Sequence, residues 1–186
     1  DHSSVEGATE LPYDIPNFSV QLKTMDSKVP VLWWRSVGHS HTAHAVETFM
    51  DQLSLAAGSD PLEFRYRHLR DDPRIKGVLD LVGEKAGWNT RSSRDRVKGL
   101  AVHKSFGTYV AQVVDLGVSS GGQYQVEKVV CAVDCGVAIN PDIIRAQMEG
   151  GIGYGLSPAL MSEIKIEKGQ VKNSNFDSHD VLRMRD

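Results

Sequence analysis

The sequence predicts an α+β fold in which a helical segment is followed by antiparallel strands with an inserted helix. Three observations support this prediction. Apolar residues in the first half recur at helical spacing. After residue 96 the apolar period changes to two, with glycine-containing turns between the alternating runs. Finally, three predicted helices start with an Asp or Asn cap followed by proline, at 60–61, 72–73 and 140–141.

The first predicted segment covers residues 1–89. Prolines interrupt residues 1–32, which we expect to be extended apart from a short strand at 17–25. The helix that follows has Ser40 as its N-cap and Gly58 just beyond its end. One face of this helix is apolar and carries Ala43, Val46, Met50, Leu53 and Ala57. Two further helices start at the Asp–Pro pairs.

The second predicted segment covers residues 97–186 and contains most of the strands. Alternating runs predict an antiparallel meander of three strands, at 97–105, 108–118 and 124–134. A helix over 141–160 is inserted after them, and a hairpin turning near Gly169 follows. This order of strands, helix and hairpin is typical of a fragment of a larger domain.

The two cysteines, Cys131 and Cys135, lie four residues apart in the third alternating run. On a strand this spacing separates the Cα atoms by about 13 Å. A disulfide requires roughly 4.4–6.8 Å, and the paired short loops of a zinc site are missing. We therefore expect both cysteines to be small buried side chains.

Composition narrows the functional class. The formal net charge is −3, and no run of lysine or arginine suggests a nucleic-acid surface. No apolar stretch is long enough to predict a membrane-spanning helix. The chain starts at Asp1 without methionine, and its two ends favour an internal fragment of a longer protein. The compartment is left open between the bacterial periplasm or cell envelope and the cytoplasm.

The stretch WWRSVGHSHTAH, residues 33–44, is the first candidate site. His39, His41 and His44 have a spacing that zinc sites use, but no frame such as His-Glu-x-x-His surrounds them. The same turn precedes a helix N-terminus, where free N–H groups suit an anionic ligand, and Gly38 permits close approach. A simple capped turn with solvated histidines is the third interpretation.

The stretch RAQMEGGIGYGLSPAL, residues 145–160, is the second candidate site. Its glycines do not match G-x-G-x-x-G and they do not follow a strand, which argues against a dinucleotide site. Gly151 and Gly155 leave one helix face without side chains, suited to close packing against a neighbouring element or a flat cofactor. Gln147 lies on that face, and its amide can read the edge of a heterocycle.

At these residues the sequence resembles the molybdopterin-binding large subunit of the xanthine oxidase/aldehyde oxidoreductase family. One segment is VLWWRSVGHSHTAHAVETFMDQLSLAAGSDPLEFRYRHL, and the other is VCAVDCGVAINPDIIRAQMEGGIGYGLSPALMSEI. The form WWRSVGHSH, together with DHSSVEGA and LPYDIPN, is most similar to the isoquinoline 1-oxidoreductase and aldehyde dehydrogenase branch. The resemblance covers nearly the whole chain.

The resemblance implies roles for six residues. It implies that Arg35, whose backbone N–H lies beside the metal centre in the family, binds the cofactor with Ser36, Gly38 and Gln147. It places Trp34 and Val37 in the substrate pocket, at positions that are commonly Phe in the family. Valine cannot stack on a flat ring as Phe does. The histidines occupy positions of the turn itself, which favours a structural role over a metal site.

The implied activity is oxidative hydroxylation of an N-heterocycle or aldehyde with water-derived oxygen. Electrons would pass to a small [2Fe-2S] partner subunit, and the cofactor of the full-length protein would be molybdopterin with molybdenum. The catalytic glutamate of the family stands in a Gly-Glu-Pro-type motif that this chain lacks, and Glu84 and Glu149 do not replace it. We therefore expect no catalytic residue in this chain, and neither turnover nor bound cofactor in the isolated fragment.

Two alternatives stay open. The chain could be a non-catalytic scaffold or binding module of the same ancestry, or a small zinc protein that uses the histidine cluster. Removal of a cofactor or neighbouring lobes would leave Gly38, Gln147 and the 151–155 face bare, so self-association of the isolated chain is also expected.

Overall fold

The structure is a computed structural model that describes residues 2–26, 29–90 and 95–184. Packing divides the chain into two compact units, namely Asp1–Thr24 with Leu32–Gly136 and Met25–Val31 with Val137–Asp186. These bounds differ from the two segments that the sequence suggests, because the long strands pack with the helices that precede them. The mixture of helices and antiparallel strands confirms the predicted α+β class.

The first unit begins with a short 3-10 helix, η1 (His2–Val5), and contains three α-helices: α1 (His39–Ala56), α2 (Pro61–His68) and α3 (Pro73–Lys85). The predicted caps of α2 and α3 are confirmed, since the Asp60 side chain accepts from Leu62 and Glu63 N–H and that of Asp72 from Arg74 N–H. Gly58 and Gly87 follow α1 and α3 in the left-handed conformation expected after a helix.

The sheet of this unit has the predicted meander topology. Strands β1 (Arg96–Ser105), β2 (Thr108–Val118) and β3 (Tyr124–Asp134) pair antiparallel in the order β1-β2-β3. Gly107 turns the first hairpin with a φ of 79°, and Gly122 turns the second with a φ of 77°. Strand bounds agree with the alternating runs to within one residue, because alternation and turn residues give the same answer.

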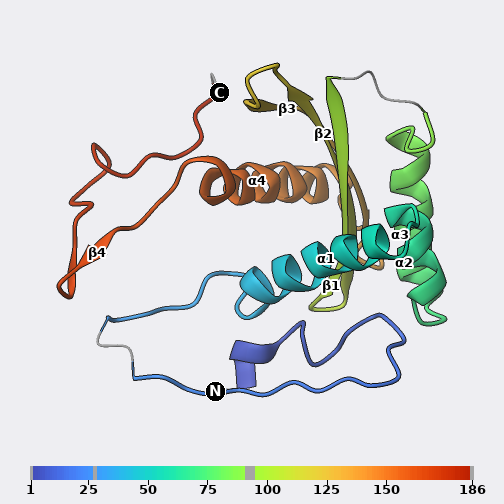
Figure 1. Ribbon diagram of the computed structural model, residues 1–186, viewed down its shortest axis with the longest axis horizontal. Coiled ribbons are helices and arrows are strands. Elements are labelled where there is room, and N and C mark those ends of the chain that lie inside the picture. The colour runs from blue at the N-terminus through green and yellow to red at the C-terminus, as the bar shows by residue number, and fades with distance from the viewer. Residues whose placement is uncertain (1, 27–28, 91–94, 185–186) are drawn as a thin grey trace. The chain divides into compact units, whose positions relative to one another are not determined.

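Helix α3 covers one face of this sheet (Figure 1). Its apolar stripe, predicted from helical spacing, is buried and consists of Ile75, Val78, Leu79 and Val82. The facing side chains come from alternate positions of the strands and include Leu100, Val102, Ala111, Val113 and Ala132. This layer is the hydrophobic core of the first unit.

A buried ionic cluster fixes α1 to its neighbours. The Glu47 carboxylate accepts hydrogen bonds from Arg65 Nε (2.9 Å), from the Val102 backbone N–H (2.9 Å) and from the Tyr13 hydroxyl (2.7 Å). Arg65 is fully buried, and its Nη1 also lies 2.6 Å from a carboxylate oxygen of Asp51. The cluster therefore joins α1 to α2, to the edge of β1 and to the N-terminal segment.

The pKa shifts within the cluster keep Tyr13 neutral and Arg65 positively charged. Burial, followed by the Glu47 carboxylate, raises the pKa of Tyr13 above its ordinary value, so the phenol stays protonated. Burial alone lowers the pKa of Arg65, but Glu47, Tyr13 and Asp51 outweigh it and the net pKa is raised. A buried guanidinium with these partners is fully charged, and loss of a partner would leave it uncompensated.

The second unit contains α4 (Pro141–Leu160) and a two-stranded hairpin of β4 (Ile166–Glu167) and β5 (Gln170–Val171). Asn140 caps α4 by accepting from Asp142 and Ile143 N–H, with proline at the first helical position as predicted. Gly169 lies in the hairpin turn, as expected. Helix α4 lies in sequence between the three-stranded sheet and this hairpin, as predicted, and the hairpin forms a sheet of its own.

One predicted strand and one predicted buried cysteine are wrong. Residues 17–25 form no strand, although their side chains alternate weakly, and Phe18 and Leu22 are about half exposed because no neighbouring strand pairs with this segment. Cys135 is exposed, since it lies one residue beyond the end of β3 and is not on a strand. Cys131 is half-buried within β3, and both cysteines are free.

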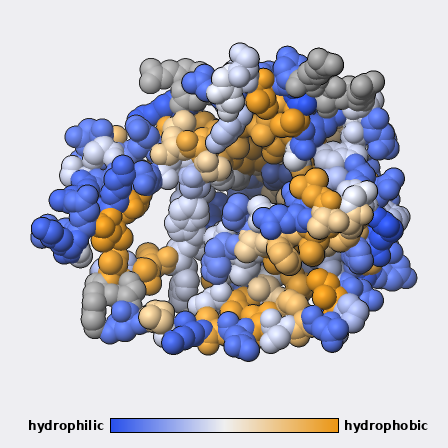
Figure 2. Space-filling view, in the orientation of Figure 1, coloured by the Kyte–Doolittle hydropathy of each residue, from blue (hydrophilic) through white to orange (hydrophobic). Residues whose placement is uncertain are grey.

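Apolar side chains remain at the surface of both units. Leu32, Trp33 and Ile143 are 92%, 71% and 60% exposed, and Figure 2 shows apolar surface among the hydrophilic side chains of the face in view. Among the described residues, no helix combines the length and apolarity needed to cross a membrane.

Candidate functional site

The predicted cofactor turn lies at the surface immediately before α1. Trp34 and Arg35 are exposed, while Ser36 and Val37 are half-buried. A hydrogen bond from the Val37 N–H to the Trp34 carbonyl (3.0 Å) closes the turn. Val37 has a φ of 47°, a left-handed conformation that is strained for a β-branched residue. Surrounding contacts must hold such a conformation, so the turn has a defined shape.

Ser40 is not the helix N-cap that the sequence predicts. Gly38 occupies the N-cap position, already in the helical region of φ and ψ, and α1 begins at His39. The Ser40 N–H and hydroxyl both donate to the Val37 carbonyl (3.2 and 2.8 Å), and its Oγ lies 2.6 Å from Ser36 Oγ. Ser40 therefore fastens the strained turn from within the first turn of the helix.

The histidines of this region contact different parts of the first unit. His39 Nδ1 lies 2.8 Å from Nε2 of His103 on β1, and His41 Nε2 donates to the Ser4 carbonyl (3.0 Å). His44 is exposed. In the described part of the chain, no three His, Cys, Asp or Glu side chains are placed together to hold a metal ion. His39 and His41 thus anchor α1, and the zinc hypothesis finds no ligand set here.

The segment around η1 closes over the start of α1. The Thr42 hydroxyl donates to the Glu6 carbonyl (2.6 Å), and a Cβ added at Gly38 would lie 2.0 Å from the Ser3 carbonyl oxygen. Gly7 approaches the same helix end with a φ of 81°. The close approach that Gly38 permits is therefore made, on its Cβ side, by the chain's own backbone.

His103 is a residue of this region that sequence reasoning did not identify. Burial, and then the proximity of His39, lower its pKa to about 4. The ring of Phe106 lies edge-on to His39 with centroids 5.4 Å apart, and Phe106 has a left-handed φ of 49°. His103 is therefore neutral near pH 7 and forms a hydrogen bond across 64 residues of sequence.

Gln147 is the one predicted site residue in the second unit, where it is exposed on α4. Gly151 and Gly155 follow it at one and two helical turns, on the same face. A Cβ added at either glycine would meet no described atom within 4 Å. The helix has no buried residue, so this face is bare within its own unit.

The chemistry of these residues fits the cofactor that the family resemblance implies. Arg35 offers donors for anionic groups, and the Gln147 amide can donate and accept at a heterocycle edge. The bare face at Gly151 and Gly155 admits a flat ligand more closely than a side chain would allow. The Ser36 hydroxyl is shared with Ser40, and its backbone lies in the exposed turn.

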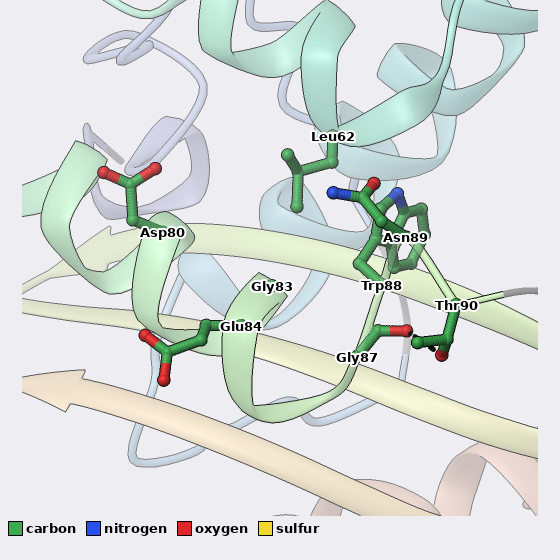
Figure 3. A pocket seen from close by; sticks show the side chains of 8 residues that line it. All are labelled: Leu62, Asp80, Gly83, Glu84, Gly87, Trp88, Asn89 and Thr90. Atoms are coloured by element: carbon green, nitrogen blue, oxygen red, sulfur yellow. Dashed lines mark hydrogen bonds between the residues drawn. The ribbon is translucent and has the colours of Figure 1, made fainter.

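A separate cavity of about 400 Å³ lies beside the C-terminal end of α3. Figure 3 shows the carboxylates of Asp80 and Glu84 at one side and the Trp88 ring at the other. The Trp88 indole N–H donates to the Asp60 carboxylate (3.0 and 3.1 Å), which also caps α2. Because these groups join α2 to α3, the cavity belongs to their packing, and none of the predicted site residues lines it.

Comparison with known proteins identifies relatives of both units. The beta chain of isoquinoline 1-oxidoreductase from Brevundimonas diminuta is 37% identical over 177 residues, which cover 92% of this chain and 22% of the relative. One of the subunits of nicotinate dehydrogenase from Pseudomonas putida is 28% identical over 189 residues, 92% of this chain and 16% of that protein. A membrane-bound aldehyde dehydrogenase (pyrroloquinoline-quinone) from Gluconacetobacter polyoxogenes is 30% identical over 174 residues, 83% of this chain and 22% of that protein.

The chain thus spans about a fifth of the length of these relatives. The family described as the molybdopterin cofactor-binding domain matches residues 43–186, which include most of α1 and all of α4. This range is more than half of the chain and confirms the family that the sequence resembles. The chain belongs to the molybdopterin cofactor-binding domain family.

Proposed function

We propose that this chain forms part of the cofactor-binding region in the large subunit of a molybdenum hydroxylase. The observation that carries the proposal is the family match over residues 43–186, supported by relatives whose names describe oxidoreductases or dehydrogenases. Because the chain spans only about a fifth of those relatives, the remaining cofactor contacts and the catalytic base would come from elsewhere in the whole protein.

In this proposal, residues of this chain bind the molybdenum cofactor and orient it. The Arg35 backbone N–H donates to the cofactor from the exposed turn, in which Ser36 and Gly38 also lie, and Gly38 is itself buried against Ser3. The Gln147 amide is a further proposed hydrogen-bond partner of the pterin. When bound, the molybdenum cofactor supplies the two-electron oxidation of a substrate carbon. Trp34 lines the substrate pocket.

We assign no catalytic residue within the chain. Glu84 and Glu149 are both exposed, and Glu84 pairs with its neighbour Lys85 at 3.0 Å. A general base has to lie within hydrogen-bond reach of the reacting proton. Glu84 lines the cavity beside α3, which none of the predicted site residues lines, and Glu149 lies on the exposed surface of α4. The proposed catalytic glutamate is therefore outside these 186 residues.

The proposed substrate is a small N-heterocycle or an aldehyde, which the names of the relatives suggest. Val37 bears on this choice, because its short side chain cannot stack on a ring and leaves more space than Phe would. The proposed electron acceptor is a small [2Fe-2S] subunit, since two of the relatives are themselves named as subunits.

Elemental analysis of the protein, produced at its natural length in its own host, tests the proposal. We expect about one molybdenum per chain, with iron at about two atoms per [2Fe-2S] cluster of a co-purifying partner. The Gln147→Ala variant should retain less molybdenum after dialysis, whereas Gln125→Ala, which removes an exposed amide from β3, should retain the wild-type amount. A folded protein without molybdenum would instead support a non-catalytic scaffold.

A further inference from the structure

We propose that His103 is a positioning residue for the cofactor-binding turn, acting through His39. The inference rests on the proposed function of that turn and adds a residue that lies outside both candidate motifs. His39 is the first residue of α1 and directly follows Gly38. Whatever fixes the His39 ring therefore fixes the end of the Trp34–Gly38 turn.

The geometry of the pair supports this role. His39 Nδ1 and His103 Nε2 are 2.8 Å apart, with the rings at 70° to each other. Strand β1 provides a rigid support, since it is paired with β2 along its whole length. Gly7 closes the site from the third side, because a Cβ there would lie 2.7 Å from His39 Nδ1 and 3.2 Å from His103 Cε1. The contact is thus partly buried among three segments of the first unit.

The strained backbone of the turn is the reason why the His39–His103 hydrogen bond matters. Val37 holds a left-handed conformation that a β-branched side chain disfavours. Ser40 fastens the Val37 carbonyl, but Ser40 belongs to the same helical turn and moves with it. The hydrogen bond from His39 to β1 connects that helical turn to a separate element. His41 and Thr42 tie the same helical turn to the N-terminal segment only. Without the bond to His103, the turn can therefore relax by shifting the first residues of α1 relative to β1.

Protonation of His103 should release the turn. His39 faces His103 from α1. Glu6 of the N-terminal segment lies beside Gly38, and its Oε2 is buried without a hydrogen-bond partner among the described residues. Lys104, the next residue of β1, points to the Tyr109 ring. No carboxylate hydrogen-bonds either imidazole among the described contacts. A proton on His103 therefore places a positive charge against the His39 ring, with no carboxylate bonded to it among the described contacts.

The direction of the pH effect follows from the lowered pKa of His103. Its unfolded-state pKa is about 6.5, and its folded-state pKa is about 4. The stabilising contact is complete above pH 6.5 and is lost as the pH falls through about 4, because the unfolded chain takes up the proton first. Exchange of the turn amides, corrected for the intrinsic rate, should rise over this interval.

The test compares His103→Leu and His103→Gln with the wild-type protein at its natural length. Glutamine can return a hydrogen-bond donor near the Nε2 position, but it does not titrate. His44→Leu, which removes an exposed histidine from the same helix, is the matched control. The readouts are amide exchange at residues 35–38 between pH 7.5 and 4, and molybdenum retained per chain after dialysis.

We expect His103→Leu to speed exchange at residues 35–38 at least fivefold at pH 7.5 and to retain less than half of the molybdenum. His103→Gln should restore both values and abolish the pH dependence, and His44→Leu should match the wild type. Wild-type exchange and retention in His103→Leu would overturn the inference. A wild-type protein without molybdenum would overturn the proposed function, and the exchange data would still decide whether His103 positions the turn.

Discussion

Helix α1 follows the predicted cofactor turn and helix α4 carries Gln147, and the two helices are stabilised in different ways. Helix α1 has four buried residues, three of which are polar or charged: Thr42, Glu47 and Ser54, with Met50 as the apolar one. Helix α4 has none, and it has four glycines with open space around them. The first unit therefore holds its turn through its own contacts, whereas the glycine face of α4 has no described side chain packed on it.

The largest effect should come from the buried cluster beneath α1. Glu47→Ala leaves the guanidinium of Arg65 buried without its main partner, and we expect a loss of about 3–5 kcal/mol in the free energy of unfolding. Gln52→Ala, at an exposed position of the same helix, should change it by less than about 0.5 kcal/mol. Urea denaturation measures both. Equal stability of the two variants would show that α1 is not held by this cluster.

Gly7→Ala should have the next largest effect, because it places a methyl group between the N-terminal segment and α1. The added Cβ would lie 2.5 Å from Thr42 Oγ1 in a backbone with a φ of 81°. Gly122→Ala is the matched control, since that glycine has a φ of 77° and no described neighbour within 4 Å. We expect Gly7→Ala to cost about 1–3 kcal/mol more than the control in urea denaturation. Equal losses would mean that backbone strain alone matters.

A smaller effect of opposite sign is expected in α4. Gly151→Ala and Gly155→Ala should each stabilise the helix by about 0.5–1 kcal/mol, because alanine loses less backbone entropy on folding. In the protein at its natural length, the same changes should lower the retained molybdenum. Gly153→Ala, on the opposite face, should stabilise the helix without that loss. Thermal unfolding and elemental analysis separate the two outcomes, and unchanged molybdenum in all three variants would exclude the glycine face as a binding surface.

The weakest effect concerns the isolated 186-residue chain. Its bare α4 face and exposed Leu32 and Trp33 should favour self-association at high protein concentration. Sedimentation velocity at several concentrations measures this, and the same sample should contain little molybdenum because many cofactor contacts are absent. A monomer at every concentration, or one molybdenum per chain, would contradict the inference that α4 presents an uncovered face in the isolated chain.

Local patterns predicted much of the fold because each pattern has a short-range cause. The Asp–Pro and Asn–Pro caps, the alternating strands and the glycines after helices all act within a few residues. The prediction of a strand at 17–25 was wrong because a strand needs a partner strand, which the spacing of residues along the sequence does not reveal. The predicted burial of Cys135 was wrong for a related reason, since it depended on a strand that ends at Asp134.

The candidate site was predictable where motifs are contiguous. The turn at residues 34–38 and Gln147 were identified from two short segments, and their binding roles stay predictions. The Glu47–Arg65 pair and His103 were not identified, because their partners are 18 and 64 residues away and no local spacing marks them. A charged residue on the apolar side of a predicted helix, as Glu47 is, was the available signal.

The central claim is that the Trp34–Gly38 turn contacts the cofactor, and amide exchange tests it most directly. Exchange at residues 35–38 would be measured in the protein at its natural length, before and after release of the cofactor. The turn at residues 119–122 of the same unit serves as the reference. We predict slower exchange at residues 35–38 in the loaded protein and no change at the reference turn. Identical exchange at residues 35–38 in the two states would contradict the account.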